Sequence, residues 1–286
     1  MSSPARASLQ LMGGTHLSYV TSGNEERPAV LLIHGFPSSA NTFRDILAPL
    51  AEVAFVVALD LPGFGRSEVL PTTTFDGLAA ATGELIDHLK VRDRFIYVHD
   101  YGAPVAFRIA MNAPERVRGL IIQNANAHRT GFGLQWQDTF EFWSRPTPET
   151  EAAATGHLTF EGVRDQYIAG VPDEVARKIS PSVWEEDWRA ICAPDRLAAQ
   201  RALLADYGNY VARFEAISHY LRTRQPPALM VWGRHDVFFE LAETVSWMED
   251  LPRMEAHILD GGHFLLETHA AVAGKLMRDF IERTTR

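Results

Sequence analysis

The chain has 286 residues, of which 46% are hydrophobic and 22% charged. This length and composition suit one large α/β domain that carries an inserted subdomain. The formal net charge of −9 argues against a nucleic-acid or anionic-membrane partner, and a single cysteine, Cys192, excludes an intrachain disulfide and fits a reducing cytoplasm.

Eight strands are predicted, and their spacing gives a mostly parallel sheet. Several of them are continuous apolar runs, as expected for strands buried on both faces, and a Gly13-Gly14 turn joins the first two as a hairpin. The predicted strands cover residues 8–12, 16–21, 29–33, 54–59, 95–98, 120–122, 228–232 and 255–259.

Helical spacing of apolar residues alternates with these strands. Helices on both faces of a parallel sheet follow from this alternation. The predicted helices cover residues 41–50, 75–89, 241–249 and 270–283, with one more that begins at Gly102.

The alternation stops at about residue 127. Residues 128–225 contain no convincing buried strand, and amphipathic stretches in this segment are separated by prolines. We therefore expect a helical insertion over 128–225, within an α/β core formed by residues 1–127 and 226–286.

Residues 94–110 form the central motif of the sequence. A buried strand ends at Val98 and a helix begins at Gly102, so Asp100 occupies a tight turn between them. Such a turn gives its middle residue a strained backbone at the end of the sheet, and Gly102 suits a helix that passes close to a strand. Next to a helix N-terminus, the Asp100 carboxylate is expected to stay ionised; its alternative role is a simple helix cap.

Three further motifs follow predicted strands: His34-Gly-Phe-Pro37, Trp232-Gly-Arg-His-Asp236 and Gly261-Gly-His-Phe264. Since ligands of open α/β sheets bind outside the carboxyl ends of the strands, Asp100, Asp236 and His263 should meet at one edge. In this order, the motifs resemble those of the α/β-hydrolase superfamily, and more narrowly its epoxide hydrolase and haloalkane dehalogenase branch.

The resemblance implies an α/β-hydrolase fold with a helical cap and a triad of Asp100, His263 and Asp236. An ionised carboxylate attacks without a base. At an sp³ carbon that bears an epoxide oxygen or a halide, this attack gives an alkyl ester. His263 would then activate water against the ester, with Asp236 fixing the imidazole. The backbone N–H groups of Phe36 and Tyr101 are the candidate oxyanion hole.

The two branches differ in the residues that stabilise the leaving group. Haloalkane dehalogenases usually place Trp after the nucleophile and Trp or Asn beside the oxyanion loop, where this chain has Tyr101 and Phe36. Epoxide hydrolases usually supply two cap tyrosines. Tyr207 matches the second of these, with helix packing as its alternative role, and Thr139 beside Phe140 stands where the first is expected.

Three other residues are considered for the substrate or leaving-group side of the site. Tyr167 is a substitute for the missing cap tyrosine. Trp143 is assigned as a possible halide donor, with core packing as its alternative. His34 is also placed there, and its alternative role is to orient the oxyanion loop.

The favoured activity is epoxide hydrolysis on a small-molecule substrate, in a cytoplasmic enzyme without cofactor or metal. Two alternatives stay open. One is dehalogenation of a haloalkane or halo-acid, and the other is a receptor-like α/β-hydrolase that binds a ligand with little turnover. A homodimer is compatible with the sequence, which does not fix the oligomeric state.

Overall fold

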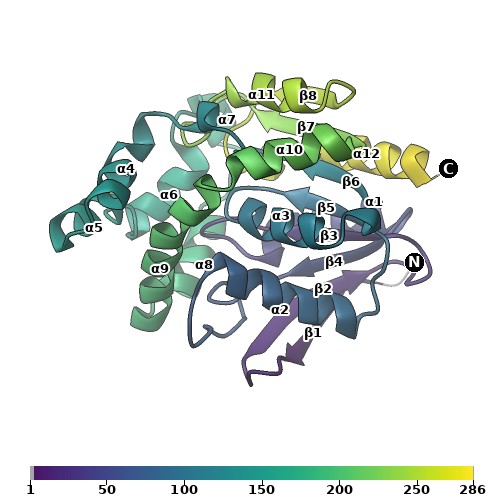
Figure 1. Ribbon diagram of the computed structural model, residues 1–286, viewed down its shortest axis with the longest axis horizontal. Helices are drawn as coiled ribbons and strands as arrows, with labels where there is room; N and C mark the ends of the chain where they lie inside the picture. The colour runs from purple at the N-terminus through teal and green to yellow at the C-terminus, as the bar shows by residue number, and fades with distance from the viewer. Residues whose placement is uncertain (1–2, 286) are drawn as a thin grey trace.

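The computed structural model describes residues 3–285, so residues 1, 2 and 286 of the expected core lie outside it. Its centre is an eight-stranded sheet in the order β1-β2-β4-β3-β5-β6-β7-β8 (Figure 1). The pairs β1–β2 and β2–β4 are antiparallel, and the others are parallel. The strands are β1 (Ala5–Gln10), β2 (His16–Ser22), β3 (Ala29–Ile33), β4 (Phe55–Leu59), β5 (Arg94–Val98), β6 (Val117–Ile122), β7 (Ala228–Gly233) and β8 (Glu255–Leu259).

The apolar runs of the sequence account for the interior of this sheet. Every residue of β3, β4, β5 and β7 is buried, as expected for parallel strands covered on both faces. β8 is an edge strand and alternates between partly buried and exposed residues. The predicted fold class is therefore confirmed: an α/β fold with a mostly parallel, eight-stranded sheet.

Large apolar clusters form the core on both faces of the sheet. One face packs against α1 and α12, through residues such as Leu47 and Met277, and the other against α2 and α3, through residues such as Leu78 and Val105. The helices around the sheet are η1 (Ala40–Phe43), α1 (Leu47–Ala51), α2 (Phe75–His88), α3 (Gly102–Asn112), η2 (Pro114–Arg116), α11 (Glu243–Asp250) and α12 (Leu266–Thr285).

Two predicted helices differ in detail from the observed ones. The single helix expected over 41–50 is instead the short 3-10 helix η1 followed by α1. Pro49 explains the break, because it lacks an N–H and is tolerated only in the first turn of a helix. The last helix, α12, extends to Leu266, but a kink with non-helical backbone at His269 separates its first turn from the helix that continues from residue 270, where the predicted helix begins.

Within the described range, a series of helical segments lies between β6 and β7. Figure 1 shows α4, α5, α6 and α9 grouped beyond one end of the sheet, with α10 running back along it. Prolines occupy the first helical position of α5, α8 and α9, where their missing N–H has no helical partner to lose. The segments are η3 (Arg129–Gly131), η4 (Leu134–Trp136), α4 (Gln137–Ser144), α5 (Pro148–Ala154), α6 (Phe160–Ile168), α7 (Asp173–Ala176), α8 (Pro181–Ile191), α9 (Pro194–Val211) and α10 (Phe214–Arg224).

None of the helices in the described part of the chain is both long enough and apolar enough to cross a membrane. The longest, α12, is amphipathic and packs one side against the sheet.

Candidate active site

Asp100 lies in the turn between β5 and α3 with a φ of 44°. This left-handed conformation is strained for a residue other than glycine. The turn also depends on close backbone approaches: a Cβ on Gly102 would lie 2.5 Å from the carbonyl oxygen of Ile33, and one on Gly35 would lie 2.3 Å from the Asp100 Cβ. The expected tight turn is therefore present, and neighbouring glycines permit it.

The Asp100 side chain is buried and faces the loop that follows β3. Its Oδ1 accepts a hydrogen bond of 2.6 Å from the backbone N–H of Phe36. It does not cap α3, since the N-cap of that helix is Tyr101 and makes no side-chain cap bond. The cap alternative for Asp100 is therefore set aside.

Burial raises the pKa of Asp100 above its ordinary value. Attraction by His263 and hydrogen bonds from the N–H groups of Tyr101 and Phe36 oppose this rise. The expectation that the carboxylate simply stays ionised took account of the helix N-terminus but not of burial. In the structure, its charge also depends on His263 and on the two backbone donors.

Asp236, His263 and Asp100 form a line across the carboxyl edge of the sheet. The Nδ1 of His263 lies 2.9 Å from Oδ2 of Asp236, and its Nε2 lies 4.0 Å from Oδ2 of Asp100. Nδ1 donates to the carboxylate of Asp236, so in the neutral imidazole Nε2 carries the lone pair. No hydrogen-bond partner of Nε2 is found among residues 3–285, so it is free to accept a proton in the space beside Asp100.

Both oxygens of Asp236 are saturated by donors. Oδ1 accepts from the backbone N–H groups of Phe238 at 2.7 Å and Phe239 at 3.1 Å, and Oδ2 accepts from His263 and from Nδ2 of Asn124 at 2.8 Å. Asn124 was not predicted from the sequence. It follows β6 at the same edge of the sheet, so the rule that located the other residues could have identified it.

Opposing effects set the charge state of His263. Burial lowers its pKa, whereas the charge of Asp236, the hydrogen bond to it and the charge of Asp100 raise it, and the net shift is upward from 6.5. The ring of His99 lies against His263 with centroids 4.8 Å apart. His99 is buried, and burial together with the neighbouring His263 lowers its own pKa, so it packs there as a neutral ring.

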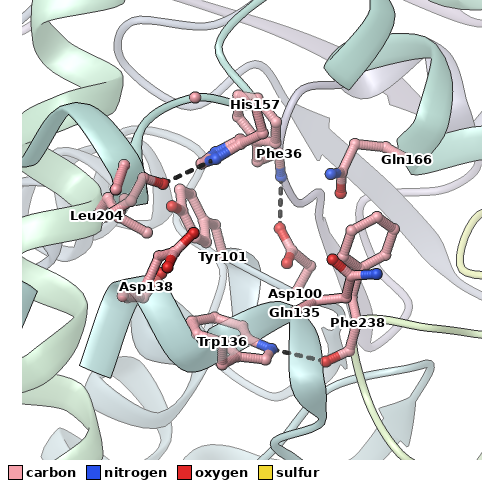
Figure 2. A pocket seen from close by; sticks show the side chains of 14 residues that line it. Phe36, Asp100, Tyr101, Gln135, Trp136, Asp138, His157, Gln166, Leu204 and Phe238 are labelled. Carbon is pink, nitrogen blue, oxygen red and sulfur yellow. Dashed lines mark hydrogen bonds between the residues drawn. The ribbon is translucent and has the colours of Figure 1, made fainter. Parts of the chain in front are cut away.

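A cavity of about 380 Å³ opens onto Asp100. Figure 2 shows Gln166 and Asp138 on opposite sides of it, with Tyr101 and Trp136 also on its wall. Residues between β6 and β7 supply most of the lining. The complete set is Phe36, Asp100, Tyr101, Gln135, Trp136, Asp138, Thr139, Ala153, Ala154, Gly156, His157, Gln166, Leu204 and Phe238.

Tyr207 does not take the place expected for a cap proton donor. It is fully buried and is not among the lining residues. Its hydroxyl donates a 2.5 Å hydrogen bond to Oδ1 of Asn126, and its ring packs against those of Tyr101 and Trp136. The assignment of Tyr207 to the leaving group is corrected accordingly: it is a packing residue behind the cavity wall.

His34 and Trp143 are likewise corrected, because neither lines the cavity. The Nδ1 of His34 donates to the carbonyl of Gly35, and its Nε2 accepts from the N–H of Leu61. It therefore orients the loop, which was its alternative role. The indole of Trp143 donates to the carbonyl of Leu204 at 2.9 Å, so it is not a free halide donor.

Four polar lining residues were not anticipated from the sequence: Gln135, Asp138, His157 and Gln166. The last two are the more buried of these. Gln166 is 7% exposed, and Figure 2 shows its amide without a hydrogen bond to the other lining residues. His157 donates from Nδ1 to the carbonyl of Ala154, which leaves Nε2 as an acceptor. No sequence signal was available for either residue, because both lie outside the repeating strand–helix pattern.

The comparisons with known proteins agree with one another on the family. Residues 28–270 match the family model described as the alpha/beta hydrolase fold. The chain is 32% identical to the "Uncharacterized hydrolase YNR064C" of Saccharomyces cerevisiae over 96% of each chain. It is 28% identical to "Haloalkane dehalogenase 2" of Mycobacterium bovis, over 88% of this chain and 82% of the relative. The solved epoxide hydrolase CorEH superposes with a TM-score of 0.78 at 22% identity, over 98% of this chain and 99% of its own.

Proposed function

The chain belongs to the α/β-hydrolase fold family, and we propose that it hydrolyses an epoxide through a covalent ester on Asp100. The observation that carries this proposal is the position of Asp100 between two groups. One oxygen of its carboxylate is held by the N–H of Phe36, and the other lies 4.0 Å from the free Nε2 of His263.

In the first step, Oδ2 of Asp100 attacks an epoxide carbon and the carbon–oxygen bond opens. The hydrogen bond from Phe36 to Oδ1 leaves Oδ2 as the less encumbered nucleophile. A carboxylate needs no base for this attack, so the Asp236–His263 pair is reserved for the second step.

In the second step, water attacks the Cγ of Asp100. Nε2 of His263 takes a proton from that water, and Asp236 stabilises the imidazolium that forms. The negative charge develops on Oδ1, which the N–H of Phe36 already holds, and the N–H of Tyr101 is the second donor to this carboxyl group. When the intermediate collapses, the bond from Cγ to the ester oxygen breaks and the imidazolium returns its proton to that oxygen, so the diol leaves. The carboxylic acid that remains loses its proton and becomes the carboxylate again.

The surroundings favour an epoxide over a halide. A halide needs N–H donors, but the indole of Trp136 donates to the carbonyl of Phe238 at 2.7 Å, and that of Trp143 donates to Leu204. Dehalogenation is the second candidate, because the amide of Gln166 lies on the cavity wall and could hydrogen-bond a halide.

Residues 128–225 would serve as a cap over this site, on a core of residues 1–127 and 226–286. Support comes from the lining, since Gln135, Asp138, His157 and Gln166 from this segment share the cavity with Asp100. Opening of the cap would admit substrate, and its closure would limit water around the ester.

The test is the intact mass of the His263→Gln variant after incubation with butylene oxide or with butyl bromide. Without the base, the ester should accumulate. A mass gain equal to the whole epoxide, located on the Asp100 peptide, supports the proposal. A gain of a butyl group alone, with release of bromide, makes the protein a dehalogenase.

Two controls define the outcome. His235 lies on the same loop as Asp236 but pairs with Asp260 at 2.7 Å, so His235→Gln should turn over without accumulating adduct. Adding Asp100→Ala to His263→Gln should abolish adduct formation. If neither probe gives an adduct, the covalent mechanism is contradicted and the ligand-binding alternative gains support.

A further inference from the structure

We propose that the Tyr101 hydroxyl is the acid that protonates the epoxide oxygen as the ring opens. This inference rests on the proposed function and assigns a second role to Tyr101, whose backbone N–H already faces Asp100. The leaving oxygen of an epoxide stays on the product, so it needs a proton from a group on the cavity wall.

Tyr101 is the tyrosine that shares the cavity with Asp100. The chain has seven tyrosines, all within the described range, and Tyr101 is the one among the lining residues. Figure 2 shows its side chain on the cavity wall with Asp100 on one side and Asp138 on the other. Tyr101 is 5% exposed and lines the cavity, and no hydrogen bond of its hydroxyl is found among the described residues.

The other tyrosine hydroxyls near the site are occupied. Tyr207 donates to the side chain of Asn126, and Tyr210 donates to its backbone carbonyl at 2.6 Å. The hydroxyl of Tyr167 donates to Asp187, so the substitution of Tyr167 for the missing cap tyrosine is not supported either. A donor that already serves a buried acceptor would leave that acceptor unpaired if it turned to substrate.

The remaining polar groups on the wall are poor proton donors. The amide of Gln166 can hydrogen-bond an alkoxide but does not give up a proton. Burial lowers the pKa of His157, so its Nε2 is an acceptor at neutral pH. Asp138 is exposed to solvent, and the hydroxyl of Thr139 is a much weaker acid than a phenol.

With Tyr101 as the acid, every proton in the catalytic cycle is accounted for. Oδ2 of Asp100 forms a bond to carbon, the carbon–oxygen bond breaks, and its electron pair takes the Tyr101 proton. This gives a hydroxyalkyl ester and a phenolate. Hydrolysis of the ester to a carboxylate and a diol releases one proton, which restores the Tyr101 hydroxyl. Burial holds the pKa of Tyr101 above its ordinary value, so the resting hydroxyl is protonated.

The experiment measures how fast the adduct forms on Asp100 in the His263→Gln background, with Tyr101→Phe and Tyr207→Phe as matched variants. Tyr101→Phe should slow alkylation by butylene oxide about a hundredfold, the usual size of an acid-catalysed contribution. If the parent is also alkylated by butyl bromide at a measurable rate, that rate should change by no more than about threefold in Tyr101→Phe, because bromide leaves without a proton. Tyr207→Phe should leave epoxide alkylation within about threefold of the parent.

Two results would overturn this assignment while leaving the covalent mechanism intact. One is alkylation of Tyr101→Phe by the epoxide as fast as in the parent, and the other is a large loss of the alkylation rate in Tyr207→Phe instead. Failure of the His263→Gln parent to form any adduct would instead contradict the proposed function. Thermal melting of each variant checks folding. A solvent deuterium isotope effect on epoxide alkylation in the parent, absent in Tyr101→Phe, gives a second reading of the same proton transfer.

Discussion

Nε2 of His263 lies 4.0 Å from Oδ2 of Asp100, and no group among residues 3–285 hydrogen-bonds to that nitrogen. A base that points at a carboxylate has nothing to deprotonate there in the resting protein. Once Asp100 is esterified, His263 can act as a general base, because water at the ester carbon would then lie within reach of Nε2.

The pH dependence of ester hydrolysis should follow from this relationship. The charges of Asp236 and Asp100 raise the pKa of His263, and alkylation of Asp100 removes one of them. His263 should therefore titrate at a lower pH in the ester than in the free protein. Only neutral His263 accepts a proton, so hydrolysis should slow as the pH falls through that lower value.

The rate of ester decay in a single turnover, measured over a range of pH, gives the pKa of His263 in the ester. An NMR titration gives the pKa of His263 in the free protein. An acid limb at or above the free-protein pKa would contradict this effect of the two charges.

Asn124 should act by positioning Asp236. Its Nδ2 donates to Asp236 at 2.8 Å, and its own φ of 33° is one that glycine adopts without strain. Asn124→Gly also removes two hydrogen bonds with the backbone of Gly233, at 2.9 and 3.1 Å. It should therefore lower the free energy of unfolding by more than the roughly 2 kcal/mol that the loss of one hydrogen bond to a charged group costs. Hydrolysis of the ester should slow more than its formation, as quench-flow mass spectrometry can resolve. Equal slowing of both steps would argue against this role.

The tight turn at Asp100 should be sensitive to volume at Gly102. A Cβ there would lie 2.5 Å from the Ile33 carbonyl oxygen, so Gly102→Ala should destabilise the protein by about 2 kcal/mol or more. A Cβ added to Gly83, inside α2, would have nothing within 4 Å, and Gly83→Ala should stabilise by up to about 1 kcal/mol. Urea unfolding of both variants measures these changes. An unchanged free energy of unfolding in Gly102→Ala would refute the predicted crowding.

Acid should destabilise the fold through His34. Burial lowers the pKa of His34 from 6.5 to about 4, so the unfolded chain binds more protons between these values. Stability is then full above pH 6.5 and is lost as the pH falls toward about 4, by up to about 1.4 kcal/mol per pH unit. His34→Gln should be less stable at neutral pH but lose less on acidification.

Urea unfolding at neutral and acid pH tests this expectation, with the exposed His219→Gln as the matched control. The same acid loss in His34→Gln as in the parent would assign the effect to other groups.

The sheet was predictable because parallel strands leave continuous apolar runs in the sequence. The same regularity brings Asp100, Asp236 and His263 together, since each follows a strand at its carboxyl end. The prediction of one helix over 41–50 was less accurate. A pattern of apolar residues does not show that Pro49 breaks the helix, so that α1 begins only at Leu47.

The part of the site outside the sheet could not be predicted in this way. Tyr207 lies at the position that a motif suggests, yet its hydroxyl turns to Asn126. Side-chain direction on a helix depends on how that helix packs, which local sequence does not determine. Gln166 faces the cavity for the same reason, and no motif marks it.

The central claim is that Asp100, and not water, attacks the substrate. A single turnover of butylene oxide by excess protein in water labelled with the heavy oxygen isotope tests it most directly. The covalent mechanism predicts an unlabelled diol and one heavy oxygen in the peptide that contains Asp100, because water attacks the ester at Cγ. A labelled diol with an unlabelled Asp100 peptide would mean that water opens the epoxide directly, and would contradict the covalent mechanism.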